Sequence, residues 1–74
     1  MKKIIVLAFD LKGECWASRK KIYRLLQQIG AELVYKSHWM LPYNKRNLSD
    51  MKWVCNEIRK CGGKAEVIKG EKVI

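Results

Sequence analysis

The sequence predicts a small α+β domain in which two helices lie on one face of a mainly antiparallel sheet. Three observations favour this class: a length of 74 residues, an apolar run of strand length near the N-terminus, and two amphipathic helical stripes. With 49% hydrophobic and 31% charged residues, the composition is that of a folded domain and not of a disordered basic tail. We therefore expect one domain over residues 1–74, with no linker and no repeat.

The short chain predicts marginal stability, and the short length of its apolar run predicts a cytoplasmic location. A domain of this size buries only about 60% of the surface that its unfolded chain exposes, so we expect a homodimer that buries more. The apolar run Ile4–Phe9 is too short for a secretory signal or a membrane span, and the charge of Asp10 closes it. We therefore expect a cytoplasmic protein that does not associate with a membrane.

The first strand is expected at Ile4–Phe9, because this run is β-branched or apolar at both alternating sets of positions. Such a strand is central and covered on both faces, or on one face by a dimer mate. Asp10 lies where the strand emerges, and a loop with Gly13 follows it. This end of the strand is the first place where chemistry is expected.

A helix is expected from Ser18, as N-cap, to Ile29, with Gly30 directly after it. Its apolar stripe consists of Ile22, Leu25, Leu26 and Ile29. Its outer face is basic and carries Arg19, Lys20, Lys21 and Arg24. Cations in a first turn oppose the helix macrodipole, which a phosphate partner would explain; the alternative is that they are ordinary exposed helix formers.

Alternating apolar residues over 31–41 predict a long strand or a tight hairpin that ends at Pro42. A polar, basic loop is expected over 44–47. Ser49 is the expected N-cap of a second helix, with Leu48 and Trp53 spaced as a hydrophobic staple. The core stripe of that helix is expected to hold Met51, Val54, Cys55, Ile58 and Cys61, and Gly62-Gly63 to end it.

Residues 65–68 predict a short strand, 69–71 a turn, and 73–74 a fragment that pairs with the same sheet or a partner's sheet. The order β, α, β, β, α, β is that of the ferredoxin-like α+β plan, which leaves one sheet face for another sheet or a ligand. That open face is a natural dimer interface. The plan hosts many functions, so the fold alone does not indicate one.

Several kinds of active site are disfavoured by the sequence. No glycine-rich nucleotide loop is present, and His38 is the only histidine, so nucleophilic catalysis has no evident base. Three cysteines without a C-x-x-C pair suggest reduced thiols and neither a disulfide framework nor a zinc site. Among the aromatic residues, Trp39 and Trp53 are expected in the core, while Trp16 and Tyr43 are better placed for contacts with a ligand.

Asp10 is the candidate catalytic and metal-binding residue. One carboxylate holds Mg²⁺ poorly, because the ion prefers near-octahedral oxygen ligation. A two-fold dimer that pairs the first strands brings two copies of Asp10 together, which would form a shared Mg²⁺ site able to polarise a phosphodiester and activate water. The alternative is that Asp10 caps the turn that follows it.

A formal net charge of +9 predicts attraction to phosphates, although an ordinary solvated, lysine-rich surface is the alternative. Both halves of the chain contribute to this charge. The candidate nucleic-acid-binding residues are Lys12, Arg19, Lys20, Lys21, Arg24, Lys45 and Arg46.

The leading strand that ends in Phe9-Asp10-Leu11, the helix that closes with Gly30, and the segment Tyr35-Lys36-Ser37-His38-Trp39 together resemble a known family. This family comprises the small CRISPR-associated proteins that accompany the spacer integrase in antiviral defence. The resemblance covers Ile4 to about Ile58. It implies a ferredoxin-like homodimer that binds nucleic acid, Mg²⁺ at Asp10, endonuclease (phosphodiesterase) activity of the kind reported for some members, and an integrase partner.

This chain is shorter than is usual in that family, and residues 64–74 lack its final acidic and aromatic strand. The segments 38–42 and 62–65, with Gly30-Ala31, also resemble the related domain of chromate-resistance regulators, and Trp39 to Pro42 resembles phenylacetate-type repressors. These resemblances imply a second function, a noncatalytic regulatory or protein-interaction module. A toxin-like ribonuclease is a third possible function. The sequence does not indicate whether the nucleic acid is RNA or DNA.

Overall fold

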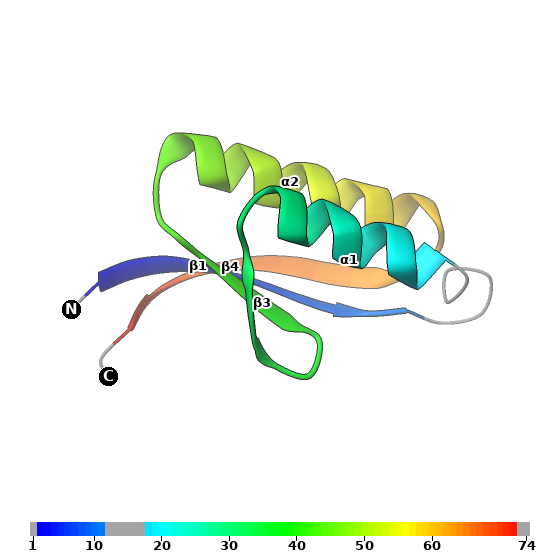
Figure 1. The fold of residues 1–74 in the computed structure, drawn as a ribbon, viewed down its shortest axis with the longest axis horizontal. Coiled ribbons are helices and arrows are strands. Elements are labelled where there is room, and N and C mark those ends of the chain that lie inside the picture. The colour runs from blue at the N-terminus through cyan, green and yellow to red at the C-terminus, as the bar shows by residue number, and fades with distance from the viewer. Residues whose placement is uncertain (1, 12–17, 73–74) are drawn as a thin grey trace.

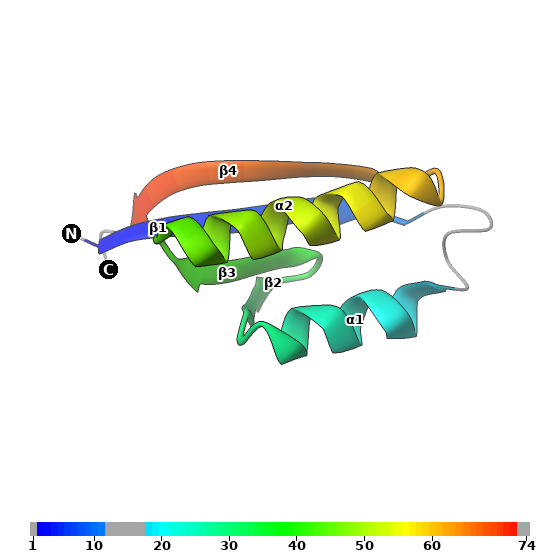
Figure 2. The same cartoon turned by 90° about the horizontal axis from the view of Figure 1, so that it is seen from above.

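The described part of the protein forms a four-stranded antiparallel sheet with two helices, so the α+β class is confirmed. The computed structural model describes residues 2–11 and 18–72. Both helices lie over the same face of the sheet, and no helix of the described residues lies on the other face (Figures 1 and 2). The elements in chain order are β1 (Lys2–Asp10), α1 (Arg19–Gln28), β2 (Glu32–Tyr35), β3 (His38–Pro42), α2 (Lys45–Lys60) and β4 (Lys64–Lys72).

The strands lie in the order β2-β3-β1-β4, and each neighbouring pair is antiparallel. β1 is central, as predicted: it pairs with β3 over residues 4–8 and with β4 along its whole length. Its odd-numbered residues Ile5, Leu7 and Phe9 are buried, while the even-numbered ones between them are half-buried. As far as the described residues go, therefore, only the helix-covered face of β1 is closed.

The uncovered side of the sheet is apolar at its centre, and we call it the open face. On β1 it consists of Ile4, Val6 and Ala8, all half-buried. Val6 lies between Met40 of β3 and Ile68 of β4 in the register, and Ile68 is 46% exposed. The sheet face that the helices leave uncovered is therefore apolar at its centre.

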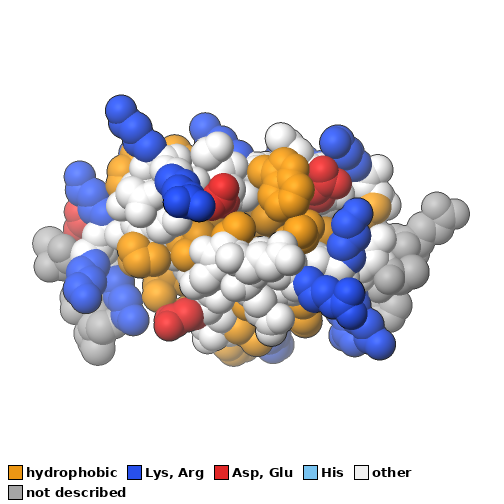
Figure 3. Space-filling view, turned by 45° about the horizontal axis from the view of Figure 1, so that its top comes forward, with side chains coloured by type: hydrophobic (Ala, Val, Ile, Leu, Met, Phe, Trp, Pro, Cys, Tyr) orange, Lys and Arg blue, Asp and Glu red, His pale blue; other side chains and the backbone are white. Residues whose placement is uncertain are grey.

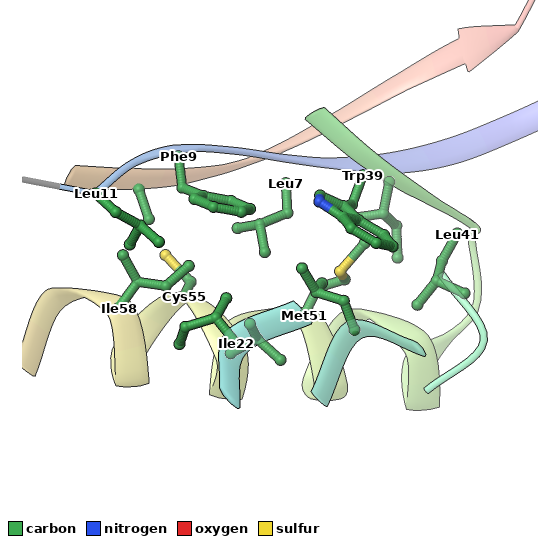
Figure 4. Packing of buried hydrophobic residues seen from close by; sticks show 13 residues of the cluster. Leu7, Phe9, Leu11, Ile22, Trp39, Leu41, Met51, Cys55 and Ile58 are labelled. Atoms are coloured by element: carbon green, nitrogen blue, oxygen red, sulfur yellow. The ribbon is translucent and has the colours of Figure 1, made fainter. Parts of the chain in front are cut away.

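The core lies between the sheet and the helices (Figure 4). Trp39 of β3 is buried there, as predicted, and its ring centroid lies 5.5 Å from that of Tyr23 on α1. The fully buried larger side chains come from both layers, which is what holds the helices to the sheet. They are Ile5, Leu7, Leu26, Met51, Val54 and Ile58.

The ends of α1 are close to the prediction. The helix begins after Ser18, the expected N-cap, although the Ser18 side chain makes no capping hydrogen bond. Gly30 follows the helix with φ of +82°, a left-handed conformation that glycine adopts without a Cβ clash. None of the described helices is long and apolar enough to cross a membrane.

α2 begins earlier than the sequence pattern predicts. Its N-cap is Asn44, whose Oδ1 accepts a hydrogen bond of 2.7 Å from the Asn47 amide, so the expected loop over 44–47 is the first helical turn. Ser49 as N-cap was therefore wrong. Tyr43 and Leu48, at the two positions of a hydrophobic staple in this register, both pack against the core.

The C-terminal third of the sheet also differs from the prediction. β4 runs without interruption from Lys64 to Lys72, so the turn expected over 69–71 is wrong. Every residue of β4 has a partner on β1, including Gly70 opposite Ile4. The expected fragment at residues 73–74 lies outside the described residues.

Two side-chain predictions need correction. Trp53 is 48% exposed and not part of the core, because the residues on the buried side of α2 are Met51, Val54, Cys55 and Ile58. The cysteines are not all reduced thiols, because Cys61 takes part in a disulfide. Cys55 is a free, buried thiol, as predicted, and Cys15 lies outside the described residues.

Candidate functional site

Asp10 ends β1 on the even-numbered set, at the rim of the open face, and its side chain is exposed. Its register partner on β4 is Lys64. A shallow hollow of about 210 Å³ lies beside it, floored by Ala8, whose small side chain leaves room between its neighbours Glu66 and His38. The candidate metal ligand therefore borders a shallow hollow of mixed polar and apolar lining that opens to solvent.

His38 of β3 also lines this hollow. Its Nδ1 lies 3.2 Å from the backbone carbonyl oxygen of Tyr35. A carbonyl oxygen only accepts hydrogen bonds, so Nδ1 is the donor in this contact. The His38 side chain is exposed and does not belong to the core.

The described residues around the hollow do not form a complete metal site. Among residues 2–11 and 18–72, no three His, Cys, Asp or Glu side chains gather closely enough to hold a metal ion. Asp10 supplies one carboxylate, and Mg²⁺ requires further oxygen ligands. A magnesium site at Asp10 would therefore need ligands besides those that the described residues place around it.

The predicted phosphate-binding residues divide into two groups at opposite ends of the helix layer. α1 and α2 run in opposite directions, so the start of α1 lies beside the end of α2 (Figure 1). Lys21 and Lys60 line one hollow of about 170 Å³ there. The Arg19 guanidinium carbon lies 5.8 Å from the centroid of the Tyr23 ring, which gives this cation a contact within the chain.

The second group lies at the start of α2. Lys45 and Arg46 are both exposed in its first turn and not in a loop. Nearby, Lys69 lies 4.8 Å from the ring centroid of Tyr43, and both line a hollow with Lys3. Tyr43, an expected ligand contact, is thus half-buried under a lysine of the same chain.

The side chains of the helix layer show the same division. In the space-filling view, Lys and Arg gather at both ends, and an apolar strip lies between them (Figure 3). Every described Lys and Arg is exposed, and no charged residue of the described part is buried. Lys12 and Trp16, both named from the sequence as contact residues, lie outside the described residues.

The sequence reasoning misplaced one member of an exposed group of residues on α2. Trp53, Asn56 and Lys60 lie on the outer side of α2 at spacings of three and four residues. Counting helical positions from the buried Val54 and Ile58 would have placed Trp53 beside Asn56 and Lys60 and not in the core.

No family model matches the chain, and no curated protein sequence matches it.

Proposed function

We propose that this chain is a nucleic-acid-binding domain of the ferredoxin-like plan that acts as a homodimer in the cytoplasm. The element order and the antiparallel sheet order β2-β3-β1-β4 support the plan. The observation that carries nucleic-acid binding is the net charge of +9 with every described Lys and Arg exposed. A field of this sign attracts phosphate backbones from solution.

The open face supports the dimer. It exposes Ile68 and half-exposes Val6 and Met40 on a sheet whose other side is already filled by the helices. Asp10 belongs to the same alternating set as Val6. A two-fold axis close to that end of the sheet would bring two Asp10 carboxylates to one site.

The resemblance of the Phe9-Asp10-Leu11 and Tyr35–Trp39 segments to the CRISPR adaptation proteins supports the same proposal. On this reading the partner is a nucleic acid, together with an integrase. Mg²⁺ would be bound by Asp10 of both copies. When bound, the ion would act as a Lewis acid on a phosphodiester, while the residues of this chain supply only the carboxylates and the basic surface.

Fluorescence anisotropy with labelled DNA and RNA oligonucleotides tests the proposal. We expect affinity to fall steeply with salt, because bound cations release the counterions of the phosphates. Asp10→Asn should remove Mg²⁺-dependent cleavage and leave affinity nearly unchanged, since the amide keeps the shape of the carboxylate and loses its charge. No salt-dependent binding by the wild-type protein would refute the proposed function.

The apolar open face also favours a second candidate, a noncatalytic regulatory or protein-interaction module. This candidate expects neither cleavage nor a response to Mg²⁺. Cleavage that is equal in wild type and Asp10→Asn would eliminate Asp10 as the metal ligand. Binding without any cleavage would favour a structural nucleic-acid-binding role over a nuclease.

A further inference from the structure

Trp53 is a large aromatic side chain on the solvent side of a helix. Its side chain is 48% exposed and does not pack in the core, because the buried side of α2 is formed by other residues, among them Val54 and Ile58. Arg46 and Lys60 lie seven residues before and after it, so all three project from the same side, about 10 Å apart along the axis. An indole is thus placed between two cations.

Two hollows meet beside Trp53. One of about 420 Å³ is lined by Trp53, Asn56, Glu57, Arg59 and Lys60. The other, of about 290 Å³, is lined by Lys52, Cys55, Asn56, Arg59 and Val67. Asn56 and Arg59 belong to both, so the two hollows adjoin on the outer side of α2, and the second one reaches β4 at Val67. We call the two together the α2 groove.

The charge of the α2 groove is positive. Lys52, Arg59 and Lys60 lie in it against one carboxylate, that of Glu57, whose Oε1 is 3.5 Å from the Lys60 ammonium nitrogen. Arg59 is held in place because its Nε and Nη2 donate hydrogen bonds of 3.1 and 2.7 Å to the Ala65 carbonyl. These bonds leave other N–H groups of the guanidinium for a ligand.

We propose that the α2 groove binds single-stranded nucleic acid, with one base stacked on Trp53 and the adjoining phosphates on Lys52, Arg59 and Lys60. This inference rests on the proposed function and specifies the form of nucleic acid. Stacking on an indole requires a base whose face is free, and a duplex does not offer one. Asn56 has a donor and an acceptor with which to contact the edge of that base.

The test compares Trp53→Ala with wild type on a single-stranded oligonucleotide and on a duplex of the same sequence. We expect the single-strand Kd to rise about 5- to 150-fold, the range for loss of one stacked base. Duplex affinity should change less than 2-fold. Trp53→Phe keeps an aromatic face, so it should restore most of the single-strand affinity.

Lys20→Gln combined with Lys21→Gln is the matched control, because these exposed lysines lie on α1, outside the α2 groove. Removal of these two charges should weaken the binding of the single strand and of the duplex to a similar degree. Circular dichroism of Trp53→Ala should match wild type, since the side chain is outside the core. As a direct readout, binding of the single strand should quench the intrinsic tryptophan fluorescence of the wild-type protein more than that of Trp53→Phe.

Unchanged single-strand affinity in a folded Trp53→Ala protein would overturn the inference and leave the proposed function standing. Equal losses for single strand and duplex would also overturn it, because they would indicate a general electrostatic effect. Absence of any binding by wild type would refute the proposed function itself. In that case the exposed Trp53 would indicate a protein partner.

Discussion

Arg59 joins two elements through one side chain. Its guanidinium donates two hydrogen bonds to the Ala65 carbonyl, so the end of α2 is fixed to the start of β4 across the Gly62 turn. The carbonyl belongs to a residue that is only 6% exposed. Such a charge-assisted contact is stronger than an exposed ion pair on the helix surface.

Arg59→Met should therefore lower the free energy of unfolding by about 1–2 kcal/mol, since it keeps the aliphatic stem and removes both donors. Urea denaturation followed by circular dichroism measures this change. Lys60→Met is the control: its exposed pair with Glu57, at 3.5 Å, should contribute less than about 0.5 kcal/mol. Equal losses in the two variants would show that the Ala65 contact has no special role.

The two described tryptophans show what residue patterns can and cannot predict. Trp39 alternates with Leu41 along a strand, and the same alternation buries both. Trp53 was assigned to the core because Ser49 was taken as the N-cap, five residues after the observed N-cap Asn44. That start made Trp53 the staple partner of Leu48, so its position around the helix axis was not considered. The burial of Trp39 depended on a period of two, which the sequence displays directly.

At the scale of elements, the start of α2 depends on a choice between two good N-caps. Asn44 and Ser49 are both residue types that cap helices. Asn44 is the N-cap in the structure, because its Oδ1 accepts a hydrogen bond from the backbone amide of Asn47. The side-chain Nδ2 of Asn47 in turn donates a 2.9 Å hydrogen bond to the Pro42 carbonyl. Two linked bonds connect the helix to β3, which a pattern of residue types does not reveal.

Asn44→Ala should destabilise the protein by about 1 kcal/mol, because an orphan helix amide loses its acceptor. Ser49→Ala should be neutral or stabilise by up to about 0.5 kcal/mol, since Ser49 is an exposed residue within the helix. Thermal unfolding of the two variants beside wild type distinguishes them. The reverse ranking would place the helix start at Ser49.

β4 illustrates how pairing overrides local signals. Lys69-Gly70-Glu71 has the composition of a turn, yet each of its residues pairs with β1. An unbroken ladder on the central strand satisfies the backbone groups of these residues, and that advantage outweighs the low strand propensity of Gly70. The ladder exists only after β1 and β4, far apart in the chain, have met.

For the whole molecule, the open face has the greatest consequence. The helices fill one side of the sheet, and Ile68 leaves 46% of its surface exposed on the other. Leu33 on β2 is exposed to a similar extent, 52%, but its register partner is the inward-facing Trp39, so it lies outside the open face. The two residues provide a matched pair for testing the dimer.

Ile68→Lys should weaken dimerisation, whereas Leu33→Lys should not. If each copy of Ile68 is buried at the interface, the two together contribute about 4 kcal/mol to the free energy of dimerisation. This corresponds to a change of about a thousand-fold in the Kd of the dimer. Sedimentation velocity over a range of protein concentrations measures the change. A wild-type protein that stays monomeric, or a dimer unaffected by Ile68→Lys, would contradict an interface at the open face.

The sequence by itself determined the α+β class, the central strand, the two apolar helix stripes and the positive charge. These follow from periodicity and composition, which are local properties of the chain. Only the tertiary structure decided the start of α2, the length of β4, the separation of the basic residues to opposite ends, and the exposure of Trp53. Each of these depends on which distant backbone or side-chain group meets which, and such contacts form only when the sheet and helices pack together.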